Sequence, residues 1–275
     1  MDSFKPCQFY HPDTGACPRS VMDDSSTSSS GKFCYWHLDL VKDELGVTEL
    51  ESEESGDGFN LLGTSLTDLN LEARSFKRLQ LESSQLLRAH FHTVDFRDSR
   101  IQETVLAYTS FTECELQYSE WTRSELNFAT IQKCNLSGAR FNDCSLESCQ
   151  LQDSLLSKTR FQKTILRNLD FSQTDFYCSE SYEQNLFPRF HSCKFSRCLF
   201  AGRDLSFLQF HNCEFSHCSF LDSRFSRTLF RDCIFYEVDF SGSLDLDRAY
   251  FESCSFQSSS LRSIREILPD FGKKE

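Results

Sequence analysis

A large apolar side chain recurs at every fifth position over most of the chain. The first run passes through twenty-four positions from Leu61 to Phe176, and a second run covers eleven positions from Phe190 to Phe240. An α-helix repeats every 3.6 residues and a strand every two, so neither could bury a five-residue pattern on one face. The chain must turn once in each five residues, so that every apolar centre points toward a common axis. This short internal period predicts a solenoid in which each coil packs on its neighbours.

The position two residues before each apolar centre is mostly small. It holds Ser, Thr, Cys or Ala at most repeats, from Ser84 to Thr174 and again from Cys193 to Cys233. The other positions are mainly polar or charged, as a solvated wall requires. The sequence therefore predicts two inward positions in each repeat, one large and one small, beneath a polar outer wall.

These repeats resemble those of the pentapeptide-repeat family, whose loose consensus is A(D/N)LXX. Ala129–Gln132 and Ser137–Phe141 show the pattern, and the resemblance covers roughly residues 57 to 262. It implies an all-β fold, a right-handed quadrilateral β-helix (solenoid) with four repeats, or twenty residues, in each coil. Thirty-eight apolar centres, four to a coil, then predict about nine coils.

Ten of the fourteen cysteines occupy the small inward position. A cysteine there acts as a compact apolar side chain, and the parallel Cβ directions of stacked residues suit a disulfide poorly. We therefore expect free, buried thiols and a reducing, cytoplasmic location. The ten are Cys114, Cys134, Cys144, Cys149, Cys193, Cys198, Cys213, Cys218, Cys233 and Cys254, several of them twenty residues apart.

The N-terminal segment lacks the repeat and carries a candidate zinc site. Three cysteines and one histidine could close a tetrahedral site, because thiolate and imidazole are preferred ligands of Zn²⁺. A segment this short cannot bury a sufficient core, so a structural metal would supply the missing folding free energy. His11 is a rival fourth ligand, and an arm with reduced cysteines and no metal is the alternative. The predicted ligands are Cys7, Cys17, Cys34 and His37.

The chain divides into four segments. Leu261, Ile264 and Leu268 recur at helical spacing, which predicts a short C-terminal capping helix. The alternative for this end is a homodimer contact, as the family resemblance implies. The predicted segments are a zinc-binding module at 1–37, an acidic linker at 38–57, the β-helix at 58–262, and a helix end and tail at 263–275.

The five-residue register breaks twice. Phe176 and Phe190 are fourteen residues apart, one short of three repeats. One extra residue falls between Ser241 and Arg248, where Gly242 suggests a β-bulge. Loops emerge where a solenoid loses register, and loops carry function more often than walls do. Residues 177–189 are therefore either a functional loop or a local repair of the register.

The repeats lack recognisable catalytic chemistry. Neither a glycine-rich phosphate loop nor a nucleophile-elbow motif occurs. Aspartates directly before apolar centres, such as Asp95 and Asp239, are expected to support the coil by hydrogen bonds rather than to act as acid–base catalysts. A convex rod also lacks the concave pocket that catalysis favours. We therefore predict a protein without enzymatic activity.

The charge distribution bears on the class of partner. The chain has a net charge of −12, of which −7 lies in residues 1–55 and −5 in residues 56–275. This acidic balance opposes direct nucleic-acid binding, and no apolar stretch approaches the ~20 residues that span a membrane. We expect a scaffold that binds a protein partner through its outer walls and N-terminal module. The resemblance implies an alternative, a DNA mimic that binds and protects a type II topoisomerase (DNA gyrase), which would need denser negative charge.

Overall fold

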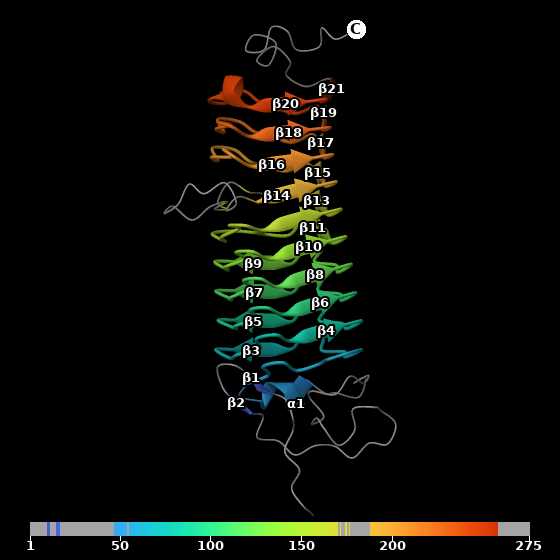
Figure 1. Ribbon diagram of the computed structural model, residues 1–275. Helices are drawn as coiled ribbons and strands as arrows, with labels where there is room; N and C mark the ends of the chain where they lie inside the picture. The colour runs from blue at the N-terminus through green and yellow to red at the C-terminus, as the bar shows by residue number, and fades with distance from the viewer. Residues whose placement is uncertain are drawn as a thin grey trace, which may run out of the picture.

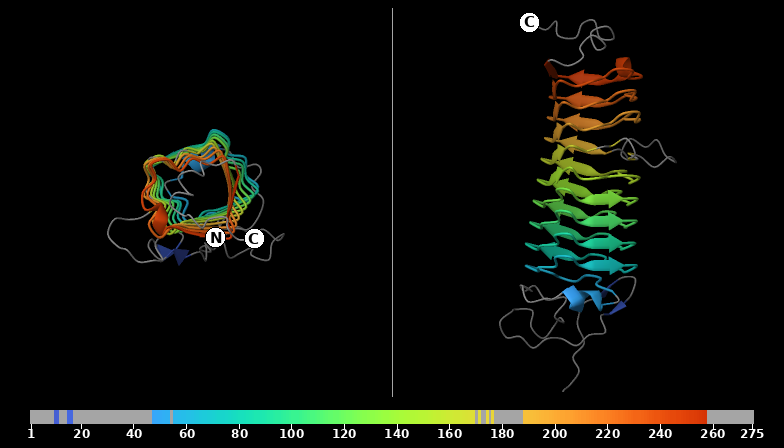
Figure 2. Two further views of the ribbon diagram at one scale, coloured as in Figure 1. Left: turned by 90° about the horizontal axis from the view of Figure 1, so that it is seen from above. Right: turned by 180° about the vertical axis from the view of Figure 1, so that it is seen from behind.

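The structure, a computed structural model, is a rod of stacked coils. It describes residues 10–11, 15–16, 47–53, 55–169, 171, 174, 176 and 188–257. The coils lie directly above one another along the rod (Figure 1), and the view down the axis shows their four-sided outline (Figure 2). The predicted all-β, right-handed solenoid of about nine coils is confirmed.

Each coil has four sides, which we name A to D in chain order. Side A is a nine-stranded parallel sheet, side B a six-stranded one, side C a four-stranded one, and side D is joined by isolated bridges such as Ser75↔Asp95. Partners on side A are twenty residues apart, as in Arg140↔Arg160, except across the two register breaks. The sequence period and the coil length therefore agree.

The strands are three residues long, with the middle side chain directed inward. Side A contains β4 (Gln80–Glu82), β6 (Arg100–Gln102), β8 (Glu120–Thr122), β10 (Arg140–Asn142), β12 (Arg160–Gln162), β14 (Arg189–His191), β16 (Gln209–His211), β18 (Leu229–Arg231) and β20 (Tyr250–Glu252). Side B contains β11 (Ser145–Glu147), β13 (Ile165–Arg167), β15 (Lys194–Ser196), β17 (Glu214–Ser216), β19 (Ile234–Tyr236) and β21 (Ser255–Gln257). Side C contains β3 (Asn70–Glu72), β5 (His90–His92), β7 (Ser110–Thr112) and β9 (Thr130–Gln132).

Four further elements lie outside these sheets. Strands β1 (Tyr10–His11) and β2 (Gly15–Ala16) form an antiparallel pair. Helix α1 (Val47–Glu51) lies inside the segment predicted as an acidic linker, and its Leu50 is buried in the apolar core. A 3₁₀ turn, η2 (Leu246–Arg248), interrupts side D near the C-terminal end of the rod. The predicted capping helix at 263–275 lies outside the described residues.

The corners of the coil adopt left-handed backbone conformations. The residue two positions after each apolar centre has a positive φ, for example 62° at Asp68 and 61° at Phe128, and most of these residues are not glycine. Such a conformation costs a non-glycine residue roughly 1–2 kcal/mol. The corner N–H groups donate to the next coil, as from Asp68 to the Leu87 carbonyl at 2.9 Å, and these bonds offset the strain.

The small inward position has a hydrogen-bonding role as well as a steric one. The hydroxyl of Thr109 donates to the carbonyl oxygen of Leu86 at 2.7 Å, and that of Ser223 donates to Phe200 at 2.6 Å. Cys213 donates its thiol in the same way to Phe190. Each donor lies twenty-three residues after its acceptor, so the bond joins one coil to the coil before it. The ability to donate this hydrogen bond, together with small size, explains why Ser, Thr and Cys occupy the small inward position.

All ten cysteines predicted to be free are free in the structure. Nine are buried, while Cys254 near the end of the rod is partly exposed. Burial raises the pKa of Cys149 to about 12 and that of Cys144 to about 11. These thiols therefore stay protonated in the folded protein at neutral pH.

The raised pKa of Cys149 predicts a loss of stability at high pH. Its thiol titrates near 9 when unfolded and near 12 when folded, so above pH 9 the unfolded chain loses the proton first. The stabilisation is complete below about pH 9, and about 1.4 kcal/mol is lost for each pH unit above it. Urea unfolding at pH 8 and pH 10 should show a smaller pH dependence for Cys149→Ala than for the wild type. Equal slopes would contradict the prediction.

Aromatic rings form columns inside the C-terminal half of the rod. On side A, Phe141, Phe161, Phe190, Phe210 and Phe230 stack with centroids 4.9–5.0 Å apart and ring planes within 8°. A second column on side B joins Phe195 to Phe215 at 4.6 Å, and Phe215 to Phe235 at 5.0 Å. The columns touch edge to face across the core, so the interior is filled and the walls are held rigidly.

Candidate functional site

The second register break creates a hollow on the outside of the rod. The extra residue before Arg248 is taken up by the η2 turn, which begins after Asp245 in a left-handed conformation, φ 54°. The expected β-bulge is absent there, and Gly242, φ 67°, occupies a regular corner. The corner next to Arg227 is thus reshaped, although the Arg227 N–H still donates to the Arg248 carbonyl at 3.1 Å.

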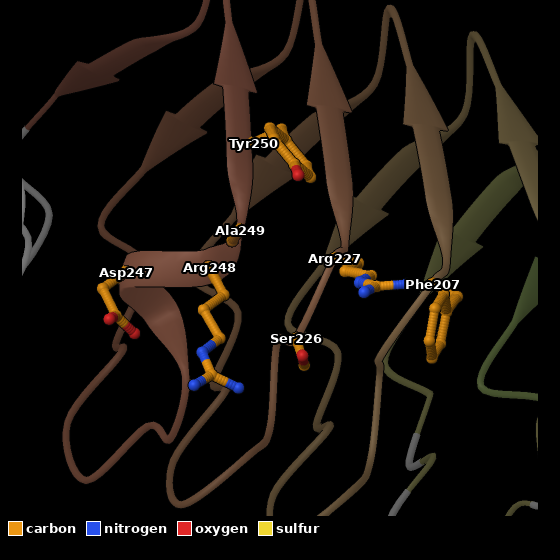
Figure 3. A pocket seen from close by; sticks show the side chains of 7 residues that line it. All are labelled: Phe207, Ser226, Arg227, Asp247, Arg248, Ala249 and Tyr250. Carbon is orange, nitrogen blue, oxygen red and sulfur yellow. The ribbon is translucent and has the colours of Figure 1, made fainter.

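The hollow, which we call the corner pocket, has two adjoining parts of about 660 and 490 Å³. Phe207, Arg227 and Tyr250 line both parts, so they form one continuous depression. Figure 3 shows Arg227 directed toward Phe207 on the neighbouring corner, with Tyr250 on strand β20 beside them. The other lining residues are Gln209, Ser226, Leu229, Asp247, Arg248, Ala249 and Glu252.

The lining of the corner pocket combines aromatic rings with two arginines and two carboxylates, those of Asp247 and Glu252. The guanidinium of Arg227 lies 5.7 Å from the centre of the Phe207 ring, within the range of a cation–π contact. Tyr250 is 56% exposed, and Arg227 and Arg248 are also exposed. Neither histidine nor cysteine, common general bases and nucleophiles at neutral pH, lines the pocket. Aromatic and arginine side chains are typical of protein interfaces.

Exposed aromatic side chains also occur at a corner between sides B and C. Tyr108 and Phe128, one coil apart, stack with their ring centres 5.0 Å apart and are 56% and 47% exposed. Both residues are corner residues with positive φ and lie outside the core. They form a second apolar surface, and neither residue lines the corner pocket.

Ion pairs between successive coils neutralise much of the outer wall. Acidic and basic side chains twenty residues apart face each other, as in Asp68–Arg88 at 2.7 Å and Glu120–Arg140 at 2.8 Å. Others are Glu103–Arg123, Glu113–Lys133, Glu147–Arg167 and Lys194–Glu214. Exposed pairs contribute little stability, roughly 0–1 kcal/mol each. The alternation of sign weighs against a wall that imitates the uniform charge of DNA.

The aspartates before apolar centres support the coil as predicted. Oδ1 of Asp239 accepts hydrogen bonds from the Ser241 N–H at 2.9 Å and from its hydroxyl at 2.6 Å. Asp95 accepts from the N–H and the guanidinium of Arg97. Burial opposes the charge on Asp95, but these hydrogen bonds hold its pKa below the ordinary value. These aspartates, which belong to a residue type that can act in acid–base catalysis, therefore have structural roles.

The predicted zinc ligands Cys7, Cys17, Cys34 and His37 lie outside the described residues, as does most of the 177–189 register break. Within the described part of the chain, no group of three or more metal-binding side chains occurs. No helix there is both long and apolar enough to cross a membrane. The sequence alone does not predict the corner pocket. The one sequence feature that marks its position is the extra residue before Arg248.

Family models for pentapeptide repeats match residues 105–143, 144–177 and 208–249. Among solved structures, full-length QnrB1, a plasmid-mediated fluoroquinolone resistance protein, is 16% identical, with a TM-score of 0.30 over 76% of this chain and 99% of that chain. HetL from Nostoc sp. strain PCC 7120, a pentapeptide repeat protein involved in heterocyst differentiation regulation, is 12% identical, with a TM-score of 0.25 over 74% and 84%. Rfr23 from Cyanothece 51142 is 19% identical, with a TM-score of 0.28 over 47% and 88%.

The search among curated proteins gave no match. Most of the matched residues that the structure describes lie in coils with twenty residues between stacked partners, and the match at 208–249 also includes the second register break. The matched stretches, which cover less than half of the chain, are similar to pentapeptide repeats.

Proposed function

We propose that this protein is a non-enzymatic scaffold that binds a partner protein at the corner pocket. The observation that carries the proposal is the exposure of Arg227, Arg248 and Tyr250 around a single depression next to Phe207. Tyrosine and arginine dominate binding energy where interfaces have been dissected, because each offers a large contact area and polar groups. The backbone that carries these side chains is backed by stacked phenylalanines, so little backbone conformational entropy is lost when a partner docks.

The proposal predicts that the corner pocket, and not exposed aromatic surface in general, retains the partner. The double variant Arg227→Ala/Tyr250→Ala should weaken binding at least about thirtyfold, as expected for the loss of two central contacts. The matched control is Tyr108→Ala/Phe128→Ala, which removes two exposed aromatics elsewhere on the rod. Partners captured with the wild type from the native host would be identified, and their affinity for each purified variant measured by calorimetry. Equal affinity of the wild type and the pocket variant would refute the proposal.

We also infer a structural zinc site in the N-terminal segment, with Cys7, Cys17, Cys34 and His37 as ligands. The support is their chemistry, since three thiolates and one imidazole match the preferences of Zn²⁺. Metal analysis of the purified full-length protein should give about one equivalent of zinc, and Cys34→Ser should reduce it to a small fraction. Cys254→Ser is a suitable control because that cysteine belongs to the β-helix. Less than half an equivalent in the wild type would rule out the site.

A further inference from the structure

Two stretches on adjacent coils carry only basic charges, although the whole protein is acidic and residues 170–187 between them contain Asp170, Asp175, Glu180 and Glu183. Residues 154–169 and 188–203 contain eight lysines and arginines and no aspartate or glutamate, in a chain of net charge −12. We call these residues the basic belt. They are Lys158, Arg160, Lys163, Arg167, Arg189, Lys194, Arg197 and Arg203.

The fold brings the two halves of the belt into register. Strand β12 pairs with β14, so that Arg160 lies directly beside Arg189 on side A. Strand β13 pairs with β15, which places Ile165 beside Lys194 on side B. All members except the half-buried Arg203 are exposed. The belt is therefore centred on sides A and B and the corner between them, with Arg203 beyond side C.

Within the part of the chain that the structure describes, most of the belt shows none of the ion pairs that neutralise other parts of the wall. Arg167 is paired with Glu147 at 3.4 Å, and Lys194 with Glu214 at 3.5 Å, both on the flanking coils. Among the described residues, no acidic side chain pairs with the four central members, Arg160, Lys163, Arg189 and Arg197. Like charges placed directly opposite each other in a sheet destabilise it. An anionic partner would relieve this repulsion.

The dimensions and chemistry of the belt favour an acidic protein segment over a nucleic acid. Two coils span only about 10 Å along the rod, the width of one helix or of two strands. The flanking coils carry Asp143 and Glu147 on one edge and Glu214 on the other, which would repel a duplex with a charge every ~1.7 Å. Ile165, 42% exposed, lies among the basic residues and offers an apolar contact that a phosphate backbone cannot use.

We propose that the basic belt binds an acidic segment of a partner protein, one that combines carboxylates with apolar side chains. Arg160 and Arg189 bind neighbouring carboxylates, a pairing that the planar guanidinium favours, and Ile165 contacts an apolar side chain. The corner pocket is lined by none of these residues, so this surface and the pocket can be tested separately.

The test measures fluorescence anisotropy of a labelled peptide made of repeated Glu-Glu-Ile units, titrated with the full-length protein at about 50 mM salt. We expect saturable binding that weakens as salt screens the charges. The variant Arg160→Ala/Arg189→Ala should bind at least about tenfold more weakly, because two charge-assisted contacts are lost. The matched control is Arg140→Ala/Arg231→Ala, which removes the same charge from the same sheet at ion-paired positions and should change affinity less than about twofold.

Three results would overturn the proposal: no saturable binding by the wild type, equal weakening by the two double variants, or tighter binding of a single-stranded oligonucleotide of similar length. The last result would assign the belt to nucleic acid instead. Thermal unfolding should show that both variants are at least as stably folded as the wild type to within a few degrees in Tm, since all four arginines are exposed.

Discussion

Replacing Phe210 by alanine is expected to lower the free energy of unfolding by about 3–5 kcal/mol, the range for removing a buried aromatic side chain. Phe210 is fully buried and stacks between Phe190 and Phe230, with both centroid distances 4.9 Å. It also meets Phe215 edge to face at 5.4 Å. The cavity cannot collapse easily, because each neighbouring ring is fixed in its own column. Urea unfolding followed by circular dichroism measures the loss.

The conservative variant Phe210→Leu separates the loss of volume from the loss of stacking. It keeps most of the apolar volume and should cost less than about 2 kcal/mol. Repeat proteins can open locally, so hydrogen exchange should accompany the unfolding curves. Protection should fall most in the coils that contain Phe190, Phe210 and Phe230. A loss below about 1 kcal/mol for Phe210→Ala would show that the column is not tightly packed.

The second large effect is expected from Gly56→Ala, at the N-terminal end of the rod. A Cβ atom there would lie 2.0 and 2.1 Å from two ring carbons of Phe76, which is fully buried. Phe76 cannot move freely, because it packs against Phe59 and Phe96. Overpacking of this kind costs about 1–3 kcal/mol. Thermal unfolding and hydrogen exchange of the first coil would measure the effect.

Gly202→Ala is the control for the glycine substitution. Gly202 has a φ of 69°, but nothing lies within 4 Å of a Cβ placed there. The substitution should therefore cost only the backbone strain of a left-handed alanine, roughly 1 kcal/mol. It should leave exchange in the first coil unchanged. If Gly56→Ala proved harmless to the first coil, the close packing of Gly56 on Phe76 would be refuted.

The sequence predicts the fold almost completely, because one physical requirement repeats in every coil. Each centre must be apolar to fill the interior, so positions such as Leu66 and Phe225 are recognisable without the structure. The small position is predicted less well. Leu79 and Leu208 are large, yet they occupy the small position and are buried. The side chains of neighbouring coils leave space for them, which the sequence of one repeat does not show.

The candidate sites could be predicted only in part. The extra residue before Arg248 marks a change of register, but its outcome as a 3₁₀ turn with a depression depends on how the coil closes on Arg227. The sequence alone does not predict the basic belt, because residues 170–187 separate its two halves along the chain. Only the pairing of Arg160 with Arg189 shows that they form one surface.

The twenty-residue coil also makes the rod a molecular ruler. Arg189 of the basic belt and Tyr250 of the corner pocket lie on side A, joined through Gln209 and Leu229, which makes three coil steps or about 14 Å. Deleting or duplicating one whole coil would change this separation in steps of about 4.8 Å and preserve the direction of every side chain. A partner that engages both surfaces would thus sense the number of coils between them, and coil number becomes a determinant of specificity.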